Sequence, residues 1–296
     1  GHATPTSLQG VRCSLNDVSL GEPRGLPLGE GFGAVVAHEQ GDEGGDAREE
    51  LLDVLPESRR RAYDMKNLLS SVVDNGDIFE MKPDFAKQIV TGFGRMNGEP
   101  VGIVANQPEH VSGAIFPDSA DKAAGFIWKC DAFGIPLVYL CDTPGFMIGS
   151  QVEKEGVLQK GRKFIYATSN AQVPKFCVIT RKAYGAGIYA MAGPSFEPDA
   201  TLALPSAELA VMGPEAAVSA VFARQIAEID DPEEREAFIE EKKKEYRKDI
   251  RKQASNMQVD ELIPAGDLRK QLVSRLDSLS NKQRKNYDRH HGTVLF

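Results

Sequence analysis

The chain has 296 residues, of which 41% are hydrophobic and 26% charged, and its formal net charge is −8. This composition is ordinary for a globular protein, and the length suffices for one large α/β domain, since about 250 residues already do. The acidic balance argues against a general nucleic-acid binder, although a local basic face can still hold an anionic ligand. No apolar run reaches the roughly 18 residues that a membrane-spanning helix needs.

The cysteines and histidines show no pattern of a disulfide framework or a metal site. Cys13, Cys130, Cys141 and Cys177 have no CxxC spacing, and two of them lie inside apolar runs. Buried reduced thiols of this kind are typical of a cytoplasmic protein. Phosphate-loop, nucleophile-elbow and zinc-binding motifs are missing from the sequence, so hydrolase, kinase and zinc-enzyme interpretations lose support and we expect no bound metal.

Residues 1–55 differ in composition from the rest of the chain. They are rich in glycine, proline and acidic residues, and the first two, Gly1 and His2, resemble a tag remnant. This composition predicts loops and a weakly ordered linker. We therefore predict a loop-rich N-terminal segment over 1–55 and a folded domain over 56–296.

Beyond residue 56, helical and strand patterns alternate. Apolar spacing and turn signals predict a helix ending at Asn75-Gly76, a hairpin over 88–107 that turns at Asn97-Gly98, a helix over 120–133 capped by Ser119, a strand over 136–142, a helix over 156–171 and a strand over 175–180. Repeated strand, helix and strand units imply an α/β domain whose strands are at least partly parallel. The turns after the last two strands then lie where open α/β sheets bind ligands.

Helical spacing also assigns buried faces. In the helix over 156–171 it predicts that Leu158, Gly161, Ile165 and Thr168 are buried. A further helix begins at Pro214 and reaches Ile229, because proline suits the first helical position. A charged helix over 233–256 follows, with an apolar stripe of Ile239, Tyr246, Ile250 and Met257.

Three small residues, Gly185, Ala186 and Gly187, stand where the strand over 175–180 gives way to a helix start. Such a turn exposes backbone N–H groups that lack partners inside the helix, and the missing side chains let a ligand oxygen approach. Two interpretations follow. The turn is an anion or oxyanion site, or its small residues only allow a helix and a strand to pack tightly.

Several stretches resemble the C-terminal half of the carboxyltransferase (beta) subunit of biotin-dependent acyl-CoA carboxylases, of acetyl- and propionyl-CoA carboxylase type, and their glutaconyl-CoA decarboxylase-like relatives. The resemblance runs from about residue 56 to the end. Its motifs agree in order and spacing: AYDMKNLLSSVVDNGDIFEM, GFGRMNGEPVGIVANQP, SADKAAGFIWKCDAFGIPLVYLCDTPGFMIG, VPKFCVITRKAYGAG, PSAELAVMGPEAAV and RHHGTVLF. It implies a crotonase-like fold of repeated ββα units, in a chain that holds the biotin-binding half only.

The resemblance also implies site residues. It makes Gly185, Ala186 and Gly187 an oxyanion hole for the ureido carbonyl of biotin, which accumulates negative charge when carboxybiotin loses CO2. The turn with Gly145 and Phe146 becomes the opposing wall, and two aromatic residues complete the cofactor-binding set: Tyr184 and Tyr189. Propionyl-type members carry an acid where this chain has Tyr189, which leaves the acyl preference open.

The sequence contains no AMKM biotin-attachment motif, so biotin is expected on a separate domain or protein. The resemblance implies an acyl-CoA substrate, and as partners a biotin carboxyl carrier protein, a biotin carboxylase, a carboxyltransferase N-terminal half, and further copies of the chain in a homodimer or hexamer. Three alternatives stay open: a decarboxylase that transfers CO2 from an acyl-CoA to biotin, a biotin-independent crotonase-fold thioester enzyme, and a non-catalytic assembly module.

Overall fold

The computed structural model describes residues 55–56, 61–247, 249–280 and 282, all of which belong to one compact unit, Gln40–Phe296. The predictions made for residues 1–54, including Cys13, lie outside these residues. The division of the chain into a segment over 1–55 and a domain over 56–296 therefore stays a prediction.

The centre of this unit is a mixed sheet of eight strands in its described part, ordered β1-β2-β3-β4-β5-β6-β8, with β7 beside β5. The predicted hairpin is confirmed as the antiparallel pair β2 and β3, and β1 adds to β2 antiparallel; the remaining strands pair in parallel. The strands are β1 (Phe79–Glu80), β2 (Ile89–Met96), β3 (Glu99–Asn106), β4 (Leu137–Thr143), β5 (Lys175–Tyr184), β6 (Ala200–Ala203), β7 (Glu208–Ala210) and β8 (Glu261–Leu262).

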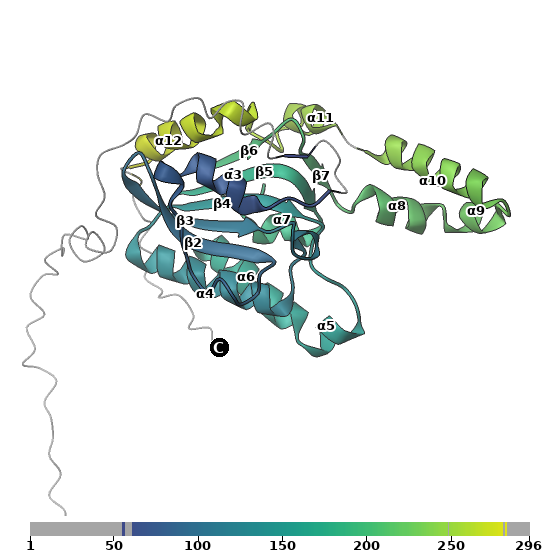
Figure 1. Ribbon diagram of the computed structural model, residues 1–296, viewed down its shortest axis with the longest axis horizontal. Helices are drawn as coiled ribbons and strands as arrows, with labels where there is room; N and C mark the ends of the chain where they lie inside the picture. The colour runs from purple at the N-terminus through teal and green to yellow at the C-terminus, as the bar shows by residue number, and fades with distance from the viewer. Residues whose placement is uncertain (1–54, 57–60, 248, 281, 283–296) are drawn as a thin grey trace, which may run out of the picture. The chain divides into compact units, whose positions relative to one another are not determined.

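Helices cover both faces of the sheet, as Figure 1 shows. One apolar core lies beneath α3 (Met65–Val72) and α12 (Leu268–Ser278), and the other lies against α4 (Pro117–Phe133) and α6 (Val157–Asn170). Every residue of β4 is buried, because a central parallel strand is covered on both faces. This explains why the first five residues of the strand, LVYLC, form a continuous apolar run rather than an alternating one.

Short elements connect these layers. Turns of 3-10 helix lie before β1, after β3 and before α12. Two short helices follow the central strands, one after β4 and one after β5. These elements are η1 (Asp74–Gly76), η2 (Val111–Gly113), η3 (Ala265–Asp267), α5 (Ser150–Lys154) and α7 (Ala186–Ala190). The predicted turn at Asn75-Gly76 is confirmed, with positive φ at both residues.

Two predictions about the helices on the α4 face need correction. The first helix begins at Pro117 rather than at Ala120, and Ser119 lies within its first turn, where its hydroxyl accepts a hydrogen bond of 2.8 Å from the Phe116 N–H. In α6 the buried face is Gly161, Phe164, Ala167 and Thr168, whereas Leu158 is 85% exposed. The buried stripe is rotated because Phe164 fills the contact between the helix and the sheet.

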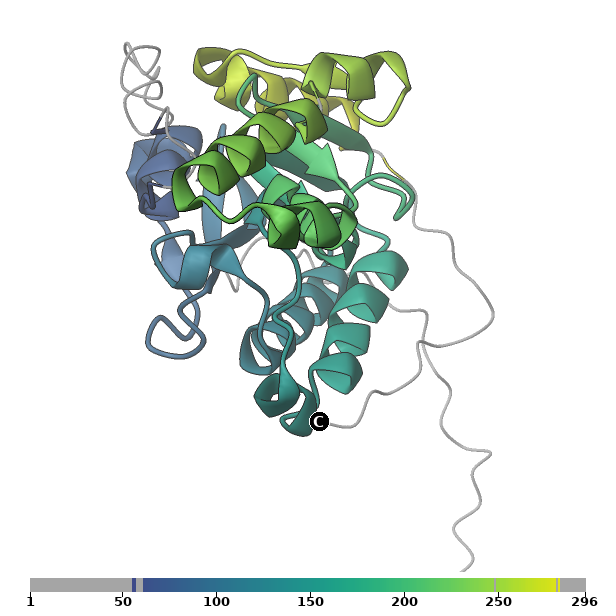
Figure 2. The same cartoon turned by 90° about the vertical axis from the view of Figure 1, so that its right-hand side faces the viewer.

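The two helices predicted over 214–229 and 233–256 are each divided, and the segment from α8 to α10 extends away from the edge where the parallel strands end (Figures 1 and 2). The helix expected over 214–229 is divided into α8 (Pro214–Val221) and α9 (Ala223–Glu228), and the charged helix into α10 (Pro232–Tyr246) and α11 (Ile250–Ser255).

Local contacts explain both breaks. The Phe222 ring at the first break packs edge-on against Phe238 and Tyr246 of α10, with ring centroids 5.9 Å apart in each pair. At the second break the Asp249 carboxylate caps α11 by accepting the Arg251 N–H at 2.9 Å. Of the predicted apolar stripe only Ile250 is buried, and Met257 is 91% exposed.

The described cysteines, Cys130, Cys141 and Cys177, are free and buried, as expected. Burial raises the pKa of the Cys130 thiol to about 12, so it stays protonated at neutral pH. In the described part of the chain, no helix combines the length and apolar character needed to cross a membrane. The same residues contain no group of three or more His, Cys, Asp or Glu side chains arranged to hold a metal ion.

Candidate active site

Three loops meet where the central parallel strands end. They follow β3, β4 and β5, and each contains glycine: Gly113 in the first, Gly145 in the second, and Gly185 and Gly187 in the third. Strand β5 extends four residues beyond the predicted strand, so RKAY is extended chain and the small residues come directly after it. The expectation that both turns lie at the carboxyl edge of the sheet is confirmed.

The turn at Gly185 has a backbone conformation that favours glycine, with φ 57° and ψ −145°, and α7 begins at the next residue. The Gly185 N–H donates to the Ala210 carbonyl at 3.1 Å, which fixes the turn to the end of β7. Since the first N–H groups of a helix lack acceptors within it, those of Ala186 and Gly187 are the donors that this turn offers. Ala186 is exposed, so a ligand can reach the turn.

The turns after β4 and β5 are in direct contact. A Cβ atom added at Gly187 would lie 2.8 Å from Gly145 Cα and 2.9 Å from Thr143 Cγ2. Gly145 has φ 115°, and its N–H donates to Thr143 Oγ1 at 3.1 Å. The absence of a side chain at Gly187 therefore allows the two backbones to approach this closely, and the positive φ of Gly145 favours glycine there.

The loop after β3 is joined to the end of β4 by one buried side chain, Asn106. Its amide donates to the Gly113 carbonyl at 3.3 Å, and its Oδ1 accepts the Asp142 N–H at 3.2 Å. A Cβ at Gly113 would lie 2.4 Å from the Asp142 carbonyl oxygen. Asn106 and Gly113 thus hold the β3 loop against β4, and the sequence motifs did not single out either residue.

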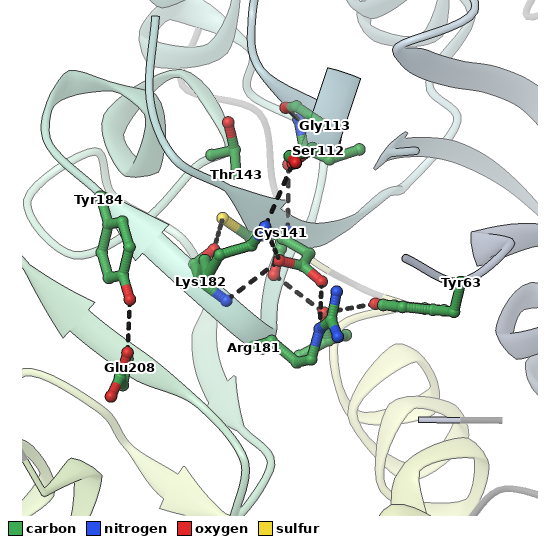
Figure 3. A network of polar contacts seen from close by, with 12 residues as sticks. Tyr63, Ser112, Gly113, Cys141, Thr143, Arg181, Lys182, Tyr184 and Glu208 are labelled. Carbon is green, nitrogen blue, oxygen red and sulfur yellow. Dashed lines mark hydrogen bonds and ion pairs between the residues drawn. The ribbon is translucent and has the colours of Figure 1, made fainter. Parts of the chain in front are cut away.

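A buried ionic network lies directly beneath these loops (Figure 3). The Asp142 carboxylate is fully buried, and its two oxygens accept the Arg181 Nε–H at 2.7 Å and the Lys182 backbone N–H at 3.2 Å. The Arg181 guanidinium lies over the Tyr63 ring, 4.4 Å from its centroid. Burial raises the pKa of the Tyr63 hydroxyl well above its ordinary value, so this group is neutral.

Lys182 belongs to the same network but lies closer to the surface. Its Nζ is 3.7 Å from Asp142 Oδ1 and donates to the Ser112 carbonyl at 3.4 Å, and its side chain is 14% exposed. Burial lowers the pKa of this ammonium, and Asp142 acts in the opposite direction. The sequence signal for the network was the presence of Asp142, Arg181 and Lys182 within otherwise apolar strands.

Tyr184 and Tyr189 occupy different positions. The Tyr184 side chain is buried, its hydroxyl donates to the Glu208 carboxylate in β7, and its ring lies 3.0 Å from where a Gly213 Cβ would be. Tyr189 is 42% exposed and stacks on Phe196 at a centroid distance of 5.2 Å. Tyr184 therefore packs where α8 starts, whereas Tyr189 reaches solvent.

Phe146 lies on the other side of the turn after β4. It forms a parallel bridge with Ile115, and its ring fills the space that a Gly161 side chain in α6 would need, with Cε1 2.8 Å from the added Cβ. This contact explains the glycine on the buried face of α6. The ring anchors the turn that faces Gly187.

Large apolar side chains are exposed on the segments that follow β3, β4, β5 and β7. They are Val111, Met147, Ile148, Tyr189, Val211 and Met212. Ile148 and Val211, on the segments that follow β4 and β7, are 84% and 80% exposed. The candidate site therefore has an apolar border.

Comparison with known proteins identifies relatives that match about four fifths of this chain. A protein from Bacillus subtilis (strain 168) named uncharacterized carboxylase YngE is 54% identical over 243 residues, which are 81% of this chain and 47% of that protein. The methylmalonyl-CoA carboxyltransferase 12S subunit of Propionibacterium freudenreichii subsp. shermanii is 42% identical, over 82% of this chain and 46% of its own. The chain spans about half the length of these relatives.

Solved structures agree with this result. The transcarboxylase 12S structure, described as a hexamer assembly with methylmalonyl-coenzyme A bound, has a TM-score of 0.76 and 39% identity, covering 88% of this chain and 50% of that one. The beta subunit of P. aeruginosa geranyl-CoA carboxylase gives a TM-score of 0.72 and 30% identity over the same shares. The predicted crotonase-like α/β fold is thereby confirmed.

The family model for the carboxyl transferase domain matches residues 30–294. Together with the relatives, this match confirms the resemblance to carboxyltransferase subunits of acyl-CoA carboxylases. The chain belongs to the carboxyl transferase domain family.

Proposed function

We propose that this chain supplies the biotin-binding half of an active site that transfers a carboxyl group between carboxybiotin, held on a carrier protein, and an acyl-CoA. One observation supports this most directly: the turn Gly185–Gly187, in which Ala186 is exposed, lies against the turn at Gly145 at the carboxyl edge of a parallel sheet, in a member of the carboxyl transferase domain family. Its small residues leave backbone N–H groups accessible to a ligand oxygen.

The chain's own residues fit a ureido group. The N–H groups of Ala186 and Gly187 are the donors for the ureido oxygen, and Gly185 shapes the turn while its N–H is bonded to Ala210. We assign Gly145 and Phe146 to the opposing wall, and Tyr184 and the exposed Tyr189 to the cofactor-binding set. Carboxybiotin supplies CO2, and the protein stabilises the negative charge left on the ureido oxygen.

A second polypeptide half is needed to bind the acyl-CoA. The chain spans about half of its relatives, and its candidate site is bordered by exposed apolar residues. We propose an N-terminal carboxyltransferase half as the partner that covers this border, and a biotin carboxyl carrier protein and a biotin carboxylase as further partners. We also propose assembly as a homodimer or hexamer and a cytoplasmic location.

The direction of transfer has two candidates because the relatives include both kinds of enzyme. A propionyl-CoA carboxylase carboxyltransferase subunit is 40% identical, and so is the alpha subunit of a methylmalonyl-CoA decarboxylase from Propionigenium modestum. Similarity to the decarboxylase subunit favours a reaction in which the acyl-CoA donates the carboxyl group to biotin. Both directions use the same oxyanion-binding turn.

The experiment is malonyl-CoA- or methylmalonyl-CoA-dependent carboxylation of biocytin by this chain, with and without the acyl-CoA-binding half. Activity that requires the added half supports the proposal. Full activity of this chain alone contradicts the division into halves, and no activity with any added half favours the assembly module.

Replacing Ala186 with tryptophan separates catalysis from assembly. The bulky side chain at the exposed turn should abolish carboxyl transfer, with a loss of about 100-fold or more if one donor is blocked, while assembly with the other half is unchanged. Ala132→Trp, at an exposed position near the carboxyl end of α4, is the matched control and should keep wild-type transfer. Equal activity of the two variants would contradict the assignment of the turn.

A further inference from the structure

The ionic network beneath the candidate site does not balance its charges. Asp142 contributes one negative charge, and two cations face it: the Arg181 guanidinium at 2.7 Å and the Lys182 ammonium at 3.7 Å. Arg181 is 1% exposed and makes the shorter contact, so the buried ion pair is formed by Arg181 and Asp142. The Lys182 charge remains in excess.

Glu208 lies opposite Lys182 in the β5–β7 pair, but its buried carboxylate accepts the Tyr184 hydroxyl and lies 3.8 Å from Arg247 Nε. The remaining titratable groups near Lys182 do not cancel its charge. Tyr63 is neutral, and its hydroxyl is hydrogen-bonded to Thr180 at 3.2 Å. The Cys141 thiol, whose pKa is raised by burial, donates to the Lys182 carbonyl at 3.7 Å. Glu215 at the start of α8 attracts the ammonium, but its side chain is 70% exposed and solvent screens it.

The position of Lys182 connects the excess charge to the site. It precedes Gly185 by three residues of β5, which span about 10 Å of extended chain. Its Nζ lies between the end of β4 and Ser112 in the loop after β3 (Figure 3). An ammonium has three N–H donors, and here two contacts, both long, occupy them within the described part of the chain.

We propose that the Lys182 ammonium provides a fixed positive charge that stabilises the negative charge developing on the ligand at the Gly185–Gly187 turn. This inference rests on the proposed carboxyl transfer. A charge held in a partly buried site acts on a neighbouring oxyanion far more strongly than it does in water, because little solvent screens it. Arg181 offsets the charge of Asp142, so Asp142, Arg181 and Lys182 together carry one net positive charge.

The test compares two substitutions of Lys182 in decarboxylation of free carboxybiotin by the chain assembled with its acyl-CoA-binding half. Lys182→Gln keeps a hydrogen-bond donor for the Ser112 carbonyl and removes the charge, and Lys182→Arg keeps the charge. We expect kcat to fall about tenfold in Lys182→Gln, with KM nearly unchanged, because one positive charge is removed from a partly screened site near the turn. Lys182→Arg should retain most of the wild-type kcat.

The pH profile gives an independent readout. Since burial lowers the pKa of Lys182, wild-type turnover should decline at alkaline pH as the ammonium loses its proton. Lys182→Arg should not show that decline, because a guanidinium stays protonated. A structural role of Lys182 alone predicts no such difference.

Lys175→Gln is the matched control. Lys175 lies in the same strand at its opposite end, is 2% exposed, donates to the carbonyls of Thr168 at 2.9 Å and Phe196 at 3.2 Å, and also has a pKa lowered by burial. It should lose stability without losing kcat per folded molecule.

Two results would overturn the inference: a Lys182→Gln variant with wild-type kcat, or a Lys182→Arg variant as slow as Lys182→Gln. Absence of turnover in the wild-type assembly would instead refute the proposed function, and the inference would fall with it.

Discussion

Gly187→Ala tests the contact on which the candidate site depends. Gly187 has no positive φ, so alanine is acceptable to its backbone and the perturbation is steric. The added Cβ would meet Gly145 Cα at 2.8 Å, and because this is backbone it cannot rotate away as a side chain could. The turns after β4 and β5 must therefore separate by several tenths of an ångström.

The expected magnitudes follow from that separation. Overpacking a fixed site by one methyl group lowers the free energy of unfolding by about 1–3 kcal/mol. The same shift displaces the Gly187 N–H from the ligand oxygen, and loss of one such donor reduces turnover by about 100- to 1000-fold. Stability alone cannot account for an effect of that size while the protein remains folded.

The assay measures carboxybiotin decarboxylation by the assembled protein, together with urea unfolding of each variant. Gly92→Ala in β2 is the control, because its Cβ would also meet backbone, the Phe79 carbonyl oxygen at 2.8 Å, but on the side of the sheet where β1 pairs with β2. It should lose similar stability and keep its turnover. Wild-type turnover in Gly187→Ala, or an equal loss in Gly92→Ala, would refute the reasoning.

Two further predictions concern stability. Lys122 Nζ donates to the Phe85 and Ile89 carbonyls, and burial lowers the pKa of this ammonium to about 8. Between about pH 8 and pH 10.4 the unfolded chain therefore binds more protons than the folded one. The free energy of unfolding should rise with pH over that range. Urea unfolding at several pH values should show a flatter dependence in Lys122→Met, and parallel curves would contradict this. Burial alone raises the pKa of Asp74, but hydrogen bonds from the N–H groups of Gly98 and Asn97 and from Arg269 lower it overall. Asp74→Ala should therefore cost about 2–3 kcal/mol near neutral pH, and less as the pH falls below 4, in the same measurement; an unchanged midpoint would contradict it.

Local signals predicted the regular elements of the sheet well. The hairpin over 88–107 and the strands that became β4 and β5 depend on apolar periodicity and on Asn97-Gly98, which act within a few residues. The ends of helices were harder, because they depend on tertiary contacts. The break at Phe222 follows from ring packing with Phe238 and Tyr246, which lie in α10, beyond the whole of α9.

The candidate site was predicted only in part for a similar reason. Gly185 to Gly187 and Gly145 carry a local signal, namely missing side chains in a turn, and their mutual contact followed from the parallel order of the strands. Asn106 carries no local signal, since it acts by joining two loops that are separated by the whole of α4. Leu158 was placed on the wrong face because spacing fixes a stripe but not the direction in which it points.

The charged residues within the apolar strands connect the fold to the site. The pairing of β4 with β5 shifts register between Cys141 and Thr143, and there the Lys182 N–H is bonded to the Asp142 carboxylate. A carboxylate at this point is costly to bury unless it is paired, and the neighbouring Arg181 pairs it. The shift brings Thr143 opposite Ala183, so that the turns at Gly145 and Gly187 meet. A hydrophobic residue at 142 would satisfy the core but leave the Lys182 N–H without its acceptor. The polar network is therefore required by the same irregularity in the sheet that brings the two turns together.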